Sequence, residues 1–93
     1  MLIEIKKRAT QRSKIIEGQI KALVKSIEDD EYCIDVMTQS LAIQQSLKSL
    51  NKLVLENHLK THVREGIAAG NEQEQNKLIE ELAKLYELSN VRG

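Results

Sequence analysis

The chain contains no proline, and no glycine lies between Cys33 and Glu65. These two residue types interrupt helices most often, because proline lacks an N–H group and glycine leaves the backbone unrestrained. An uninterrupted run of helix-tolerant residues over this distance predicts one long helix across residues 31–64 or 65.

Helices are also expected on both sides of this segment. Apolar residues at spacings of three and four predict a first helix over residues 5–28, with a buried stripe of Ile16, Ile20, Leu23 and Ile27. Asp29 or Asp30 is then expected to cap the second helix. The sequence Asn71-Glu72-Gln73-Glu74 has the pattern of a capping box before a third helix. No alternating pattern of strands is present, so the sequence predicts an all-α, three-helix protomer forming a single domain over residues 1–93.

The apolar residues of the long helix favour association with a second copy. Ile43, Leu47, Leu50 and Val54 form a stripe with heptad-like spacing. The chain has 93 residues and only two aromatic side chains, so one copy can bury a limited core. Two long amphipathic helices from different subunits would give each other the missing second layer.

Charge is unevenly distributed along this formally neutral chain. Residues 1–28 carry seven Lys and Arg residues against three Glu residues, an excess of four positive charges, and the remainder is acidic by the same amount. A basic first helix suits a polyanion such as DNA, although an ordinary solvated helix face would have the same composition.

Three potential metal ligands stand out. His58 and His62 are four residues apart and would share one face of an α-helix. Cys33 lies at the start of the same predicted helix, where free N–H groups stabilise a negative charge on sulfur. In a continuous helix, 25 residues separate Cys33 from His58, which is about 37 Å. The three side chains can therefore meet only if two copies of the helix lie antiparallel, with a two-fold axis near Ser46 or Leu47.

The same residues have plainer interpretations. Cys33 is also compatible with a small buried hydrophobe, and the two histidines with solvated or core positions. The single cysteine and the lack of a signal peptide or membrane-length apolar run lead us to expect a reducing, cytoplasmic location and no membrane partner.

At these residues the chain resembles the CsoR/RcnR/FrmR family of bacterial transcriptional repressors, and the resemblance covers nearly the whole sequence. Its strongest parts are residues 16–20, 31–36 and 58–62. The resemblance implies an antiparallel helical dimer, usually assembled further into a homotetramer. It also implies a repressor that binds operator DNA in the apo state and releases it when an effector binds.

The resemblance also implies roles for individual residues. Arg12, Lys14 and Gln19 match the basic motif of the family's first helix, whereas Ile15 stands where many members have a basic residue. We expect a DNA-binding surface formed by Lys6, Lys7, Arg8, Arg12, Lys14 and Gln19. Tyr32 matches a position that hydrogen-bonds near the metal in copper-type members, and Glu80 or Glu81 matches a similar partner. Packing of Tyr32 against the first helix is the simpler alternative.

The expected ligand set is Cys33, His58 and His62. Copper-type members have a second cysteine where this chain has His62, and nickel- or cobalt-type members have an additional histidine near the N-terminus, which this chain lacks. One thiolate with two imidazoles favours Ni, Co or Zn over Cu(I), without excluding Cu(I). Two alternatives remain open: a repressor whose Cys33 senses an electrophile or a sulfur species, and a degenerate member without tight metal binding. The absence of a nucleophile–base pair or a glycine-rich phosphate loop argues against an enzyme.

Overall fold

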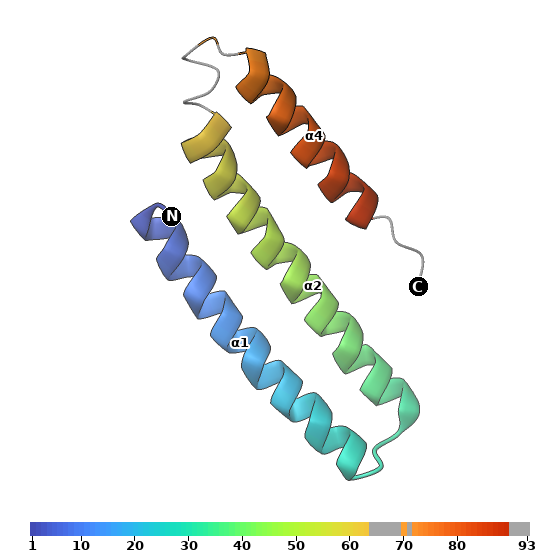
Figure 1. Ribbon diagram of the computed structural model, residues 1–93. Coiled ribbons are helices and arrows are strands. Elements are labelled where there is room, and N and C mark those ends of the chain that lie inside the picture. Colours follow the sequence, from blue (N-terminus) through green and yellow to red (C-terminus); the bar gives the residue numbers. More distant parts are fainter. Residues whose placement is uncertain (64–69, 71, 90–93) are drawn as a thin grey trace. The chain divides into compact units, whose positions relative to one another are not determined.

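The structure is a computed structural model that describes residues 1–63, 70 and 72–89, without the side chains of residues 62 and 63. The described part contains three α-helices, one π-helical turn and no strand, which confirms the all-α, three-helix prediction (Figure 1). These elements are α1 (Ile3–Glu28), α2 (Cys33–His58), η1 (Leu59–Val63) and α4 (Glu72–Ser89). The chain divides into two compact units, Met1–Asn57 and His58–Gly93.

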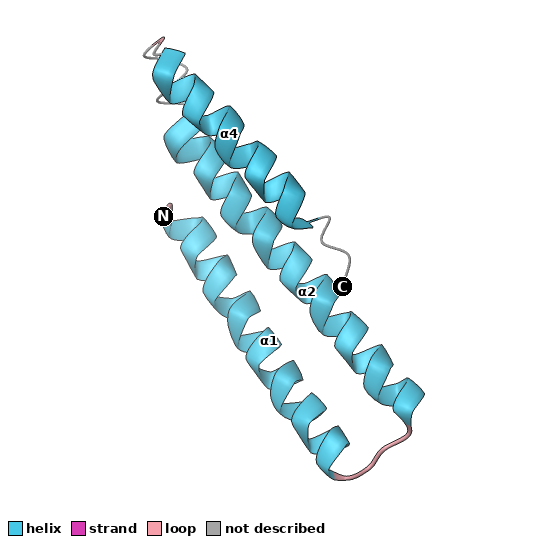
Figure 2. Ribbon diagram, turned by 45° about the vertical axis from the view of Figure 1, so that its right-hand side comes forward, coloured by secondary structure: helices cyan, strands magenta, loops and turns pink. Residues whose placement is uncertain are grey.

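The first unit is an antiparallel helical hairpin in which α1 and α2 lie side by side (Figure 2). Every residue of α1 that is buried or half-buried falls on one face, at alternating spacings of four and three: Ile5, Ala9, Arg12, Ile16, Gln19, Leu23 and Ser26. This is the spacing of a coiled-coil seam. Hydrogen bonds between Ser26 and Gln39, at 2.9 and 3.2 Å, show that this face lies against α2.

The predicted apolar stripe of α1 is therefore only half correct. Ile16 is buried and Leu23 is half-buried, but Ile20 and Ile27 are 46% and 57% exposed. The prediction counted only apolar residues, whereas the buried face also contains Arg12 and Gln19. Polar side chains can occupy such a face where they find hydrogen-bond partners across it, as Ser26 does with Gln39.

The turn between the two helices differs from the predicted cap. Asp30 has a left-handed backbone with φ of 53°, and its N–H group donates to Ile27 O at 3.2 Å. The Glu31 N–H group donates to Ser26 O at 3.0 Å. Together these bonds form a Schellman motif, so Asp29 and Asp30 end α1. Because Val36 N–H donates to Tyr32 O at 3.1 Å, Tyr32 immediately precedes α2 and Cys33 is its first residue.

The core of the hairpin is small. On α2 the buried residues are Ile43, Leu53 and Asn57, whereas Leu47 and Val54, from the same predicted stripe, are 42% and 38% exposed. Part of the predicted stripe is thus buried within the chain, and part of it remains exposed. No helix in the described residues has the length and apolar character needed to cross a membrane.

The end of the long helix departs from the predicted α-helix. The α-helical part stops at His58, and Leu59–Val63 continue as a π-helical turn. Residues 64 and 65, where the helix was expected to end, are outside the described residues, as is Asn71 of the predicted capping box. In the second unit α4 has no buried residue among those described.

Candidate metal centre and nucleic-acid interface

Cys33 is a free, exposed thiol at the N-terminal end of α2. It does not belong to the hydrophobic core of the chain, so the interpretation as a small buried hydrophobe is not supported. Tyr32, next to it, is 70% exposed, which also argues against packing on α1 as its role in the single chain. Both side chains are accessible from outside the protomer.

His58 is the last residue of α2, at the opposite end from Cys33. The helix between them is an unbroken α-helix of 26 residues, so their backbones are about 37 Å apart at 1.5 Å per residue. One metal ion cannot bind both within one chain. Consistent with this, the described residues of a single chain contain no group of three His, Cys, Asp or Glu residues able to hold a metal ion.

The His58 imidazole is oriented by a carboxylate from α4. Its Nε2 atom lies 3.1 Å from Glu81 Oε2, and the two side chains are 33% and 43% exposed. A carboxylate oxygen accepts hydrogen bonds, so in this pair the Nε2–H group of His58 donates a hydrogen bond to Glu81 Oε2. Of the two glutamates suggested by the family resemblance, the structure thus brings Glu81 to His58.

His62 lies in the π-helical turn, and its side chain is outside the described part of the structure. The prediction assumed α-helical geometry between the two histidines. A π-helix forms i→i+5 hydrogen bonds and is wider than an α-helix, so the assumed i,i+4 geometry does not describe this backbone. Nothing in the residue types of this segment, which has neither glycine nor proline, signals the change.

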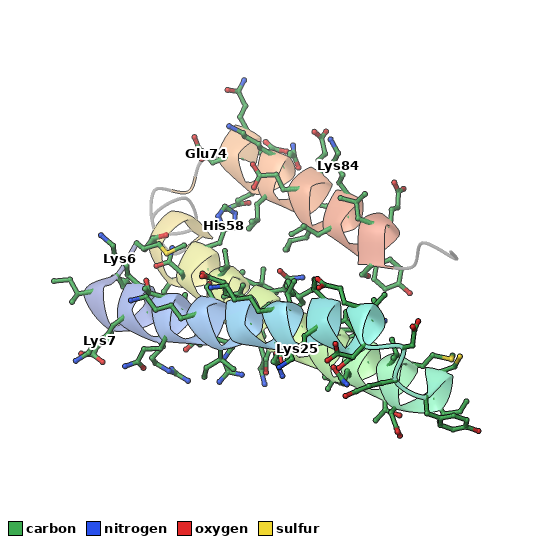
Figure 3. The ribbon with its side chains drawn as sticks, turned by 90° about the horizontal axis from the view of Figure 1, so that it is seen from below. Lys6, Lys7, Lys25, His58, Glu74 and Lys84 are labelled. Atoms are coloured by element: carbon green, nitrogen blue, oxygen red, sulfur yellow. The ribbon has the colours of Figure 1, made fainter. Side chains whose placement is uncertain are left out.

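The six predicted DNA-binding residues do not share one face of α1. Arg12 and Gln19 are half-buried on the side facing α2, and Gln19 Oε1 is buried without a hydrogen-bond partner in the described structure. Lys7 and Lys14 are exposed, as are Lys6 and Arg8. Lys6 and Lys7, being adjacent in the helix, extend to different sides of it (Figure 3).

Comparison with known proteins identifies the family. A family model described as metal-sensitive transcriptional repressor matches residues 5–88. The copper-sensing transcriptional repressor CsoR of Mycobacterium bovis (strain BCG / Pasteur 1173P2) is 39% identical over 68 residues, which cover 73% of this chain but only 57% of that relative's length. The copper-sensing transcriptional repressor RicR of Mycobacterium tuberculosis (strain ATCC 25618 / H37Rv) is 36% identical over 78 residues, covering 84% of this chain and 81% of the relative.

A solved structure shows the same fold. The crystal structure of the copper-sensing repressor CsoR with Cu(I) from Geobacillus thermodenitrificans NG80-2 matches with a TM-score of 0.79 at 30% identity, covering 92% of this chain and 90% of the other. The resemblance inferred from the sequence motifs is thereby confirmed. The family consists of repressors rather than enzymes, in agreement with the sequence prediction. The chain belongs to the family of metal-sensitive transcriptional repressors.

Proposed function

We propose that this protein is a repressor that binds operator DNA without metal and releases it when a transition metal binds between two subunits. The ligands are Cys33 of one copy and His58 and His62 of the other. The observation that carries the proposal is the position of Cys33 and His58 at opposite ends of one unbroken helix. Two antiparallel copies of α2 bring each thiol to the imidazoles of the other copy and create two equivalent sites.

The exposed apolar residues of α2 support this assembly. The midpoint between the cysteine and the histidines falls near Ser46 and Leu47. Leu47, one turn after the buried Ile43, is 42% exposed, and Val54, about two turns further along, is 38% exposed, so an apolar surface remains near the place where two copies would cross. We propose a homodimer, assembled further into a homotetramer, as the functional form.

The hydrogen bond to Glu81 prepares His58 for metal binding. With Nε2 donating to the carboxylate, Nδ1 is the ring nitrogen that would bind the ion. Carboxylates that hold the second nitrogen of a ligating histidine fix its tautomer and orientation and increase its basicity. Glu81 would therefore contribute to metal affinity without binding the metal itself.

The donor set and the relatives point to different metals. One thiolate and two imidazoles suit Zn, Ni or Co, which accept mixed nitrogen and sulfur ligands. The relatives named above sense copper, and Cu(I) prefers more thiolate than this set supplies. We propose Ni, Co or Zn as the preferred ion and retain Cu(I) as the direct competitor.

Metal and DNA affinity would be linked reciprocally. If metal lowers the affinity for DNA, DNA lowers the affinity for metal by the same factor. A duplex selected by the apo protein from a random-sequence pool supplies the probe, and fluorescence anisotropy measures its affinity with Ni(II), Co(II), Zn(II) or Cu(I) added. We expect at least one ion to weaken binding in the wild type and none to do so in Cys33→Ser. Thr38→Ser, at another exposed position of α2, is the matched control.

If no ion changes the DNA affinity of the wild type, the metal-sensing proposal fails. Equilibrium dialysis then decides whether the chain has lost tight metal binding altogether. DNA release by metal that survives Cys33→Ser would remove the thiolate from the ligand set.

The exposure of Cys33 favours one second candidate, a repressor that senses an electrophile or a sulfur species through this thiol. The exposed Cys33 sulfur at the start of α2 is accessible to such reagents, and a cysteine sulfur can react with them. Mass spectrometry of Cys33 after exposure to formaldehyde or a persulfide donor tests this. Loss of DNA binding that accompanies modification of Cys33, with no effect of any metal, would favour it over metal sensing.

A further inference from the structure

α2 carries two rows of residues that have the spacing of a coiled-coil seam. The first row lies against α1, because the Gln39 side chain bonds to Ser26 and the Asn57 side chain to the Leu2 N–H group. Its buried and half-buried members alternate at spacings of four and three: Gln39, Ile43, Ser46, Leu50, Leu53 and Asn57. The first row is therefore packed within the chain.

A second row lies beside the first on the surface of α2. From Ser40 to His58, each of its members directly follows a member of the first row and is therefore rotated from it by about 100° around the helix. The second row has the same alternating spacing: Cys33, Met37, Ser40, Gln44, Leu47, Asn51, Val54 and His58. Ser40 and His58 are half-buried, and the other members are exposed. A helix with an accessible seam of this kind can pack on another helix there.

The ends of the second row identify the other helix as α2 of a second copy. These ends are Cys33 and His58, which are ligands of the intersubunit metal site proposed above. An antiparallel copy brings Cys33 opposite His58, and each step of seven residues along one copy is then a step of seven residues back along the other.

This register matches the chemical character of the facing residues. The layers that follow from it are Ser40 with Asn51, Val54 with Met37, and Leu47 with Gln44. The first layer is polar on both sides, and the second is apolar on both sides. Only the third layer, next to the two-fold axis, is mixed. Symmetry repeats each layer once, so the dimer contains two Ser40–Asn51 pairs.

Sliding one copy by a single heptad disrupts this match. In one direction Leu47 faces Asn51, so an apolar side chain covers an amide that has no hydrogen-bond partner, which costs free energy. In the other direction Val54 and His58 pass beyond Cys33, the first residue of the other α2, and lose their partners. The first slip is therefore opposed by Asn51, and the second by the loss of contacts at the helix end.

We propose that Asn51 sets the register of the two α2 helices by pairing with Ser40 of the other copy, and that this register places Cys33 opposite His58. A single polar residue in a coiled-coil seam can specify register in this way. The inference rests on the proposed intersubunit metal site and adds the positioning residue that aligns it. Because the amide and the hydroxyl exchange water for each other, the pair acts on the register more than on stability.

Disulfide cross-linking reads the register directly. In a Cys33→Ser background the introduced cysteines are the only ones in the chain. Met37→Cys and Val54→Cys proteins, mixed in equal amounts and oxidised with diamide, should form a linked dimer. Neither protein should cross-link alone, because identical positions of the two copies are 17 residues, about 25 Å, apart along the helices. A mixture of Gln44→Cys with Val54→Cys reports the first slipped register, and it should give no disulfide between positions 44 and 54.

Asn51→Leu should move the dimer into the first slipped register, because the leucine then faces Leu47 instead of Ser40. The slip separates Cys33 from His58 by one heptad, about 10 Å. We expect the 44–54 disulfide to replace the 37–54 disulfide. In the protein that retains Cys33, affinity for each ion that the wild type binds, among Ni(II), Co(II), Zn(II) and Cu(I), should fall about tenfold, while the melting temperature does not fall.

Two controls and a rescue accompany this variant. Asn51→Gln keeps an amide in the row, and Lys52→Leu places the same leucine at an exposed position outside both rows, so both should behave as the wild type. Ser40→Leu added to Asn51→Leu should restore the 37–54 disulfide and the metal affinity. In this double variant leucine faces leucine in the original register, whereas the slipped register brings a leucine onto His58.

These outcomes distinguish the inference from the function on which it rests. A 37–54 disulfide that moves to 44–54 in Asn51→Leu, in a protein whose wild type binds no metal, supports the register and contradicts metal sensing. Dimers that form no 37–54 disulfide overturn the pairing of the second rows. An Asn51→Leu protein that keeps the 37–54 disulfide overturns the role of Asn51, whether or not its metal affinity changes.

Discussion

Asn57 is a buried polar residue near the C-terminal end of α2. It is 8% exposed, and its Oδ1 atom accepts a hydrogen bond from the Leu2 N–H group at 2.8 Å. This bond holds the start of α1 beside the last turn of α2, at a separation of 55 residues in sequence. The Asn57 side chain thus connects the two helices at the end of the hairpin that lies away from the turn.

We predict that Asn57→Ala destabilises the protein by about 1 kcal/mol, because it removes the hydrogen bond between the Leu2 N–H group and the Asn57 side chain. Urea unfolding followed by circular dichroism measures the change. Asn51→Ala, at an exposed position of the same helix, is the control and should change stability by less than about 0.5 kcal/mol. Equal effects of the two substitutions would show that the Leu2 bond contributes nothing.

Asp30 occupies the left-handed position of the turn after α1, with φ of 53°. A residue with a Cβ atom is strained there, whereas glycine is not. We predict that Asp30→Gly stabilises the protein by about 1 kcal/mol. Asp29→Gly, at a residue with φ of −87°, should give no such gain. A stabilisation that is the same at both positions would argue against backbone strain as the cause.

At the scale of elements, the α1–α2 seam depends on a polar pair as well as on apolar contacts. The Gln39 Nε2 group donates to Ser26 Oγ, and the Ser26 hydroxyl also donates to Ala22 O. The Ser26 and Gln39 side chains thus provide hydrogen-bond partners for each other. Their pairing connects the two helices at the end of the hairpin that lies next to the turn.

We predict that Ser26→Ala alone destabilises the hairpin by about 1–3 kcal/mol, because the Gln39 amide loses its partner. The double variant Ser26→Ala with Gln39→Leu should recover most of this loss, since both members of the pair are then apolar. A double-mutant cycle of unfolding free energies measures the coupling. Additive effects of the two substitutions would contradict a direct interaction.

The elements could be predicted from the sequence better than the faces they bury. The lack of proline and glycine predicted one long helix in place of α2, but not that its α-helical part ends at His58. The change of pattern at Asp29 marked the end of α1. Which residues of α1 face α2 could not be predicted from hydrophobicity, because Arg12, Gln19 and Ser26 lie on the buried side. The π-helical turn has no signal in its residue types, which include neither glycine nor proline.

The separation between Cys33 and His58 could be predicted from the sequence, but the orientation of the side chains around them could not. The opposite placement of Cys33 and His58 followed from helix length alone, and the structure agrees with it. The choice between Glu80 and Glu81 depended on the rotation of α4, which only the contact with His58 defined. The prediction placed six DNA-binding residues on one surface, but their side chains extend to different sides of α1.

At the scale of the whole molecule, the described part of one protomer does not supply a complete metal site. Its described residues form no cluster of three metal ligands, and large apolar residues of α2 such as Met37, Leu41 and Leu47 remain exposed. Both features have the same explanation if a second copy supplies the missing ligands and covers the apolar surface. The central claim is therefore that each site combines Cys33 of one subunit with the histidines of another.

Mixed oligomers of two inactive variants test this claim most directly. Cys33→Ser and His58→Gln should each fail to bind metal tightly when prepared alone. Co-refolded in equal amounts, half of the dimers contain one copy of each variant, and one of their two sites is intact, so about a quarter of the wild-type sites should return. Metal titration by equilibrium dialysis counts them. A mixture that binds no more metal than the separate variants would contradict a site shared between subunits.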